Sequence, residues 1–228
     1  MSERAGRPRI AAAFFDVDET LITVKSMFGF LAFHLRAQGL GPDAYDRAEK
    51  ELKDLAAQGV PREETNRLYY RHFAGHQAAD VAQEGRRWFA RELARDGFFH
   101  PRTLHHLRAH HAEGTVISLV SGSFPACLDP IAAHVGAHRV LCTRPRIENG
   151  VYTGELDGEP VIGEGKARAV RRAQAELGID ADACVAYGDH GSDLPMLLTA
   201  RRRIVVGTDP ALLGHLPGSG WSRLHQAA

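Results

Sequence analysis

Two aspartates, Asp16 and Asp18, directly follow the uncharged run from Ile10 to Phe15. This run is too short to span a membrane and is typical of a strand that is buried on both faces of a parallel sheet. Ligands bind beyond the carboxyl ends of such strands, so we expect both carboxylates in a site. One carboxylate can attack phosphorus to give an aspartyl phosphate, while the other protonates the leaving oxygen and later activates water. Taken alone, the pair is explained equally well as a helix cap.

A second apolar run, Val116 to Val120, ends in Ser121, Gly122 and Ser123. The following residues predict a helix that begins near Pro125. A hydroxyl group and a glycine N–H at such a junction form a cradle for phosphate oxygens. In isolation, an ordinary serine N-cap is the more common explanation.

Two further junctions carry charged side chains. Lys166 opens a helical pattern over residues 166–177, and the helix dipole disfavours a lysine there unless an anion lies nearby. Residues 183–187 predict another strand, which is followed by Asp189 and Asp193 on a glycine-containing turn. Oxygen ligands at this spacing suit Mg²⁺, which retains several waters. A surface lysine and an acidic loop that caps the next helix are the simpler alternatives.

These four elements, in this order, resemble the motifs of the haloacid dehalogenase superfamily of phosphohydrolases. The resemblance covers nearly the whole chain and is closest to subfamily IB, the branch that contains phosphoserine phosphatase. The segments that carry this closer likeness are Val120–Phe124, Asn149–Glu155 and Gly188–Met196. The resemblance implies an α/β fold, a Rossmann-like three-layer parallel sheet, with an α-helical cap inserted between the first and second motifs.

The resemblance also implies roles for individual residues. Asp16 would be the nucleophile and Asp18 the general acid and base. The ligands of the transferring phosphoryl group would be Thr20, Ser121, Gly122 and Lys166. The ligands of Mg²⁺ would be Asp16, the backbone carbonyl of Asp18, Asp189 and, through water or by orienting Lys166, Asp193. The predicted activity is hydrolysis of a small phosphate monoester in two steps through an aspartyl phosphate.

About a hundred residues separate Asp16 from Ser121, far more than one crossover helix requires. Glycine and proline divide this interval into four helical patterns, which predict a small bundle. The patterns cover residues 26–38, 43–58, 62–73 and 80–95. By the resemblance they form a cap that closes over the site. The expected division is a catalytic core of residues 1–22 and 101–228 and a cap of residues 23–100. The apolar residues at the start of the cap, which line either the pocket or the bundle core, are Met27, Phe28, Phe30 and Leu31.

The residue nine positions after Asp16 bears on the substrate. Phosphoserine phosphatases carry a glutamate there that recognises the ammonium group, whereas this chain has Lys25. A cation at an ammonium-binding position disfavours phosphoserine. We therefore expect a sugar, cyclitol or similar metabolite phosphate, or a substrate with a second anionic group, with Lys25 as a substrate-binding residue. The alternatives are an amino-acid phosphatase, a phosphotransferase or mutase that uses the same aspartyl phosphate, and a phosphate-binding scaffold without catalysis.

The composition limits the partners and the location. The 228 residues include 28 acidic and 28 basic side chains and no basic tract, so no nucleic-acid partner is expected. The segment Met1–Arg9 lacks the features of a signal peptide, and no run is long enough to span a membrane. The three cysteines, which show no CxxC spacing, are Cys127, Cys142 and Cys184. They are expected to be reduced and buried, in a cytoplasmic monomer or homodimer. The high Ala, Arg and Gly usage is weakly suggestive of secondary metabolism in a GC-rich bacterium.

The remaining patterns concern the edges of the fold. The segments 140–147 and 151–156 flank an Asn-Gly turn, which predicts a hairpin that extends the edge of the sheet. Residues 203–206 predict a last strand, and Trp221 is expected to pack on the outer core. Paired histidines at 105–106 and 110–111 have helix spacing, but no other ligand type accompanies them, so a metal site there is disfavoured. His190 is interpreted as a variable loop residue.

Overall fold

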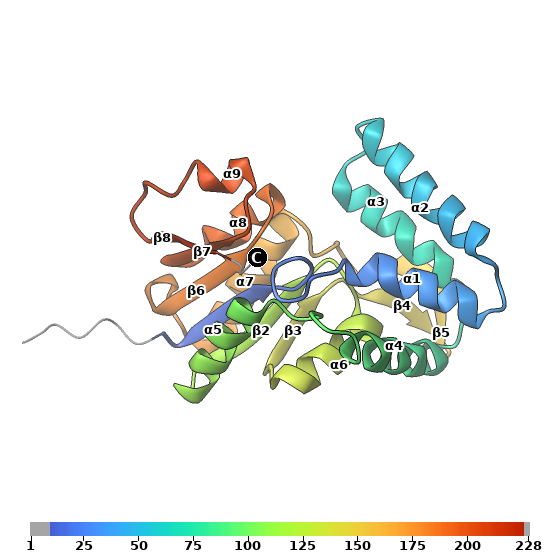
Figure 1. Cartoon of the computed structure of the whole chain (residues 1–228), viewed down its shortest axis with the longest axis horizontal. Coiled ribbons are helices and arrows are strands. Elements are labelled where there is room, and N and C mark those ends of the chain that lie inside the picture. The colour runs from blue at the N-terminus through green and yellow to red at the C-terminus, as the bar shows by residue number, and fades with distance from the viewer. Residues whose placement is uncertain (1–9, 226–228) are drawn as a thin grey trace, which may run out of the picture.

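The centre of the protein is a six-stranded parallel sheet with the strand order β3-β2-β1-β6-β7-β8 (Figure 1). The computed structural model describes residues 10–225; the N-terminal segment for which no signal peptide is expected lies outside them. The strands are β1 (Ala12–Asp16), β2 (Val116–Ser121), β3 (Arg139–Cys142), β6 (Cys184–Gly188), β7 (Arg202–Val206) and β8 (Trp221–Leu224). Because β1 and β6 are central and buried along their whole length, their ends meet in the interior of the molecule.

Helices cover both faces of this sheet. Successive residues of β1 point to opposite faces, so Phe15 belongs to one hydrophobic cluster and Phe14 to another. The helices are α5 (Pro101–Ala112) and α6 (Pro125–Val135) on the Phe15 side, and α7 (Glu164–Leu177) and α8 (Leu194–Leu197) on the Phe14 side. The short helix α9 (Pro210–Leu213) precedes β8. These three layers confirm the predicted α/β fold class.

The interval between β1 and β2 is helical, as predicted. Its elements are α1 (Ser26–Ala37), α2 (Pro42–Ala57), α3 (Arg62–Tyr69), the 3₁₀ turn η1 (Tyr70–Phe73) and α4 (Ala78–Leu93). Helices α1, α2 and α3 project beyond the carboxyl ends of the central strands, whereas α4 runs beside α6 (Figure 1). A Cβ on Gly85 of α4 would lie 1.9 Å from the carbonyl oxygen of Ala126, so only glycine permits this approach. The division into core and cap at residues 22 and 101 stays a prediction.

The predicted hairpin forms, but it does not extend the main sheet. Strands β4 (Pro145–Glu148) and β5 (Val151–Leu156) pair antiparallel around Asn149 and Gly150, whose φ angles of 51° and 82° suit a two-residue turn. The expectation of an edge extension is wrong: β4 and β5 form a two-stranded sheet of their own. The hairpin instead binds the segment before α4.

Backbone hydrogen bonds make this attachment. The N–H of Gly75 donates to the carbonyl of Tyr152 at 2.8 Å, and the N–H of Tyr152 donates to the carbonyl of His76 at 3.0 Å. The N–H of Ala78 donates to the carbonyl of Gly150 at 2.8 Å. The hairpin therefore connects the inserted helices to the chain that follows β3.

Two minor expectations were incomplete. Trp221 is half-buried, but it begins β8, a strand that the sequence did not predict; its ring stacks on His215 with centroids 5.0 Å apart. On α5, His106 and His110 lie 3.1 and 2.9 Å from the hydroxyl of Tyr187, so these imidazoles serve the packing of α5 on β6. The three cysteines are free and buried, as predicted.

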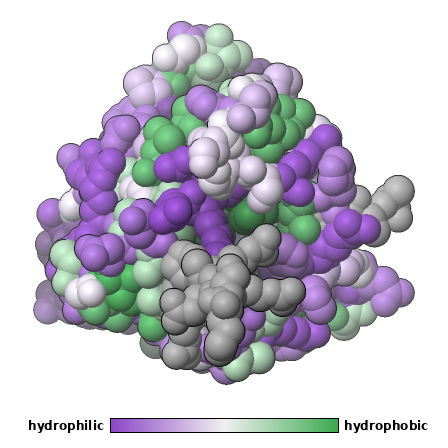
Figure 2. Space-filling view, turned by 90° about the vertical axis from the view of Figure 1, so that its left-hand side faces the viewer, coloured by the Kyte–Doolittle hydropathy of each residue, from purple (hydrophilic) through white to green (hydrophobic). Residues whose placement is uncertain are grey.

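Figure 2 shows the surface on the side away from α1, α2 and α3. There, hydrophobic residues form small groups among hydrophilic ones (Figure 2). Within residues 10–225, no helix combines the length and apolar character that a membrane span requires.

Candidate active site

Strand β1 places Asp16 at the carboxyl end of the sheet, where the side chain is buried. Lys166, in the first turn of α7, contacts it: Nζ lies 2.5 Å from Asp16 Oδ1 and 2.6 Å from Asp193 Oδ1. Burial alone would lower the pKa of Lys166, but the two carboxylates raise it above its ordinary value. Lys166 is therefore a buried ammonium group held between two acids.

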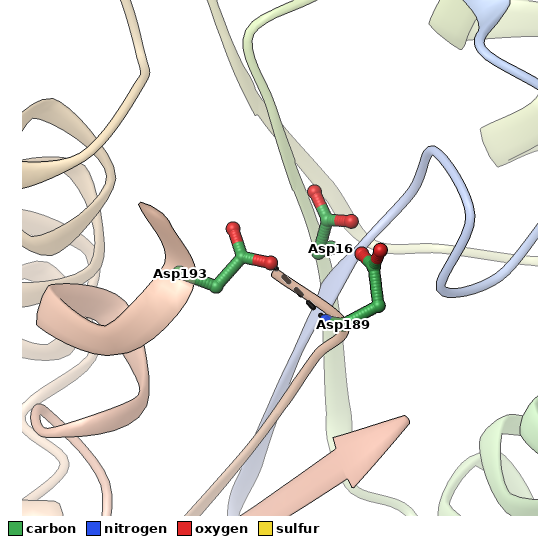
Figure 3. A group of neighbouring side chains, drawn as sticks. All are labelled: Asp16, Asp189 and Asp193. Carbon is green, nitrogen blue, oxygen red and sulfur yellow. Dashed lines mark hydrogen bonds between the residues drawn. The ribbon is translucent and has the colours of Figure 1, made fainter. Parts of the chain in front are cut away.

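The turn after β6 supplies the other acids. A Cβ on Gly188 would lie 2.7 Å from Asp193 Cβ, so a glycine is needed for the turn to fold back on the strand. Asp193 Oδ2 accepts the backbone N–H groups of Asp189 and His190, both at 3.2 Å; the bond from Asp189 is drawn in Figure 3. Thr20 Oγ1 donates to Asp189 Oδ1 at 2.7 Å. The first and last motifs thus meet directly.

Asp16, Asp189 and Asp193 converge on one region (Figure 3), and one oxygen of each lies within 4.8 Å of the others. Burial raises the pKa of Asp16 well above its usual value and that of Asp189 to about 6. The neighbouring acids add to the effect of burial, and the single positive charge of Lys166 offsets it only in part. A buried Oδ1 of Asp18 also has no hydrogen-bond partner. An oxygen-only donor set with excess negative charge fits a divalent cation such as Mg²⁺.

Asp193 differs from the other two acids because both of its oxygens already accept hydrogen bonds. Oδ1 binds Lys166, and Oδ2 binds the backbone of the turn. This arrangement favours the second of the two predicted roles of Asp193, the orientation of Lys166.

Asp18 is held by Ser26, the first residue of α1. Burial and the charge of Asp16 raise the pKa of Asp18 to about 7, although hydrogen bonds from the side chain and backbone of Ser26 lower it. A carboxyl group with a pKa near neutrality can both donate and accept a proton. Ser26 Oγ also lies within hydrogen-bond distance of Ser123 Oγ, at 3.0 Å, so α1 contacts the phosphate cradle as well.

The predicted phosphate cradle lies at the end of β2. The N–H of Ser123 donates to Ser121 Oγ at 3.0 Å, which leaves the hydroxyl proton of Ser121 directed elsewhere. The carbonyl of Gly122 accepts hydrogen bonds from the hydroxyl of Tyr70 at 2.6 Å and from Asn66 Nδ2 at 2.9 Å. The sequence did not reveal Asn66 or Tyr70, because neither belongs to a motif.

A cavity of about 460 Å³ lies between these groups and helices α1, α2 and α3. Of the four apolar residues considered for its wall, Met27 and Phe28 line it, whereas Phe30 and Leu31 are fully buried in the core. Each alternative is therefore correct for two residues: Met27 and Phe28 belong to the pocket wall, and Phe30 and Leu31 belong to the core.

Charged side chains surround the mouth of the cavity. Lys25 lines it, and its Nζ lies 3.3 Å from Glu19 Oε2. Arg62, the first residue of α3, places Nη1 2.9 Å from Nδ1 of His190. His190 thus links the turn after β6 to α3, a role that its interpretation as a variable loop residue missed. Glu19 and Arg62 had no sequence signal.

The fold and the site define the class of protein as a phosphohydrolase with an α/β fold: Asp16 ends a central strand, Lys166 contacts it from α7, and helices are inserted after β1. A family model for haloacid dehalogenase-like hydrolases matches residues 13–198. The chain belongs to this family, and the enzyme class predicted from the motifs, a phosphoric monoester hydrolase, is confirmed.

Curated relatives and solved structures agree with this membership. The chain is 33% identical over 220 residues to a probable phosphatase of Mycobacterium tuberculosis, covering 92% of this chain and 73% of the relative. It is 28% identical to phosphoserine phosphatase SerB1 of the same organism, with coverage of 92% and 69%. A Bordetella pertussis protein of unknown function superposes with a TM-score of 0.82 at 26% identity, covering 93% and 97%. A substrate-bound phosphoserine phosphatase superposes at 0.65 and 19% identity, covering 90% of each chain, which shows the common fold.

Proposed function

We propose that the protein is a Mg²⁺-dependent phosphatase that hydrolyses a small-molecule phosphate monoester through an aspartyl phosphate on Asp16. The observation that carries this proposal is the buried contact of Lys166 with Asp16 and Asp193, beside Asp18 with its pKa near neutrality. If Asp16 had only a structural role, it would not need a second acid, Asp18, that can donate and accept a proton near neutral pH. A scaffold module without catalysis would have no use for this arrangement.

The side chains divide the reaction between them. A carboxylate oxygen of Asp16 forms a bond to phosphorus as the bond to the leaving oxygen breaks, and protonated Asp18 gives its proton to that oxygen. Asp18 then takes a proton from the water that attacks phosphorus, which frees phosphate and restores Asp16. Lys166, Ser121 and the N–H of Gly122 bind the phosphoryl oxygens. Bound Mg²⁺, held by Asp16, Asp189 and the backbone carbonyl of Asp18, would offset the negative charge of the ester.

For the substrate we favour a sugar, cyclitol or similar polyol phosphate. The ion pair of Lys25 and Glu19 offers the cavity one cationic donor and one anionic acceptor, which together carry no net charge and suit hydroxyl groups. Arg62 also lines the cavity and has no carboxylate partner among the ion pairs of residues 10–225, so it can bind a second anionic group.

Phosphoserine is the second candidate. Two observations favour it: relatives are named phosphoserine phosphatase, and Glu19 with Arg62 could bind an ammonium and a carboxylate group. Lys25 opposes it, because its ammonium group competes for Glu19.

The release of phosphate to water, rather than its transfer to another alcohol, is also part of the proposal.

The test is a phosphate-release screen over sugar, cyclitol, amino-acid and nucleotide monophosphates, with Mg²⁺ and with EDTA. We expect turnover of polyol phosphates with Mg²⁺, little with EDTA, and none for Asp16→Asn. Lys25→Glu should shift the preference toward phosphoserine. Selective hydrolysis of phosphoserine by the unaltered protein would refute the polyol assignment. Activity that persists in a clean Asp16→Asn preparation would refute the mechanism.

We also propose that residues 23–100 act as the cap over this site and that the enzyme works in the cytoplasm as a monomer or homodimer. Three buried free thiols support a reducing compartment. Elution volume in size-exclusion chromatography coupled to light scattering would give the oligomeric state.

A further inference from the structure

The peptide unit between Gly122 and Ser123 is held at both ends. Its carbonyl oxygen accepts hydrogen bonds from Tyr70 and Asn66, and its N–H donates to Ser121 Oγ. Tyr70, Asn66, Ser121 and Ser123 are all buried. Both donors to the carbonyl come from the segment inserted between β1 and β2, whereas the peptide itself belongs to the phosphate cradle.

This restraint compensates for a property of Gly122. A Cβ at this position would lie 2.7 Å from Ile162 Cγ1, so the close packing of the cradle requires glycine. Glycine, however, limits its own backbone angles less than any other residue. An orientation that glycine does not fix must be fixed by its partners, and two donors to one carbonyl oxygen achieve this.

The donors are themselves well placed. Asn66 Oδ1 faces Thr143 Oγ1 at 3.4 Å, and Thr143 Oγ1 accepts the N–H of Val161 at 3.0 Å, so the amide group of Asn66 is oriented from the core. Burial raises the pKa of Tyr70 well above its usual value, which keeps its hydroxyl group a donor at neutral pH. The contact therefore does not vary with ordinary changes of pH.

We propose that Tyr70 and Asn66 are positioning residues of the active site: they hold the Gly122–Ser123 peptide, and through it the Ser121 hydroxyl, in the orientation that binds the transferring phosphoryl group. This inference rests on the proposed phosphatase function. By this inference the inserted helices do more than cover the site. They also position its groups, because the cradle has its working geometry only while α3 and η1 are docked on it.

The adjacent tyrosine provides a matched control. Tyr69 is as buried as Tyr70, and its hydroxyl group also donates to a backbone carbonyl, that of Met27 at 2.8 Å. That acceptor lies in α1, within the inserted segment itself. Tyr70→Phe and Tyr69→Phe therefore each remove one buried hydroxyl bond, but only Tyr70→Phe releases the cradle. Asn66→Asp is a second variant, which keeps the shape and replaces the donor by an acceptor.

The experiment measures kcat, KM, the inhibition constants of inorganic phosphate and orthovanadate, and the melting temperature of each variant. We expect similar losses of melting temperature in both tyrosine variants. Only Tyr70→Phe and Asn66→Asp should lose kcat, by about tenfold. The reason is that both variants release the cradle, whose own donors bind the transition state and therefore act mainly on kcat. Vanadate, which mimics the five-coordinate transition state, should lose affinity by a similar factor, while phosphate and KM change less.

Two outcomes would overturn the inference: a folded Tyr70→Phe variant with unchanged kcat and vanadate affinity, or an equal loss of both in Tyr69→Phe. If the unaltered protein hydrolyses no phosphate monoester, the proposed function fails instead. The inference would then be decided by the relative vanadate affinities of the two tyrosine variants, measured by calorimetric titration, which requires no turnover.

Discussion

At the scale of single residues, the site is a set of buried and half-buried acids with little positive charge beside them. Asp18 shows this clearly: burial raises its pKa to about 7, and the neighbouring Asp16 adds to the effect. A group that is easily protonated in the folded protein is useful for proton transfer. The same property makes its ionised form destabilising when no cation is bound.

The sign of this linkage predicts the behaviour of Asp18→Asn in EDTA. The pKa of Asp18 is about 7 in the folded protein and near 3.8 in the unfolded chain, so the folded state binds more protons between these values. Stability contributed by this group therefore rises as pH falls from 7 toward 4. We expect Asp18→Asn to be more stable than the unaltered protein at pH 8, by on the order of 1 kcal/mol or more. Urea unfolding at several pH values should show this advantage shrinking below pH 7. An advantage that grows on acidification would contradict the assignment.

The acids and the lysine that meet in the candidate site were predictable from the sequence, and their supports were not. Asp16, Lys166 and Asp189 stand at strand or helix ends in a recognisable order, so the chain itself marks them. Asn66 and Tyr70 act through one carbonyl oxygen of a residue more than fifty positions away. A contact of that kind depends on how helices dock, and no local pattern of residue types encodes it.

At the scale of elements, the contact of α4 with α6 sets how the inserted helices sit on the core. It depends on Gly85, where backbone meets backbone without an intervening side chain. Since protein interiors transmit strain rather than absorb it, a single added methyl group must move one helix.

Gly85→Ala is predicted to destabilise the protein by about 1–3 kcal/mol, because the new Cβ overlaps the carbonyl of Ala126. Chemical unfolding would measure this loss, and kcat should fall as the helices shift over the cradle. The control is Gly29→Ala in α1, where a Cβ would lie at an ordinary 3.4 Å from the Trp88 ring. Its higher helix propensity should leave stability unchanged or raise it by up to about 1 kcal/mol. If Gly85→Ala and Gly29→Ala were equally stable, the contact of α4 with α6 would have to tolerate the separation that the added Cβ imposes.

Helix periodicity and Gly-Pro punctuation predicted the inserted helices to within two residues at most ends. The hairpin shows the limit of such patterns. Asn149 and Gly150 fix the turn locally, but which neighbour the strands bind is decided by the free backbone of residues 75–78. Because this pairing depends on tertiary structure, the sequence indicated the hairpin but not the segment to which it binds.

At the scale of the whole molecule, several attachments join the inserted helices to the core, among them the contact of α4 with α6, the bonds of the hairpin and the bonds to Gly122. Together they favour a single cooperative unfolding transition over separate melting of two parts. The chain has two tryptophans, one in each region: Trp88 is fully buried in α4, and Trp221 lies at the edge of the sheet.

The variants Trp88→Phe and Trp221→Phe each leave one fluorescent reporter. We expect the two reporters to give the same urea midpoint, once each is compared with the circular dichroism of its own variant. The comparison removes any change in stability caused by the substitution itself. A reporter in α4 that changes at lower urea than the helical signal would show that the inserted helices unfold alone.

The hydrogen bond from Thr20 to Asp189 joins residues 169 positions apart in the sequence. This separation determines when the site can assemble during protein synthesis. Asp16, the proposed nucleophile, leaves the ribosome early, yet Lys166 and the acids of the last motif are made only in the final third of the chain. Until α7 and β6 dock beside β1, Asp16 lacks its contact with Lys166 and the acids Asp189 and Asp193. If Asp16 is the nucleophile, as proposed, we expect a nascent or prematurely ended chain to be inactive until the sheet is nearly complete.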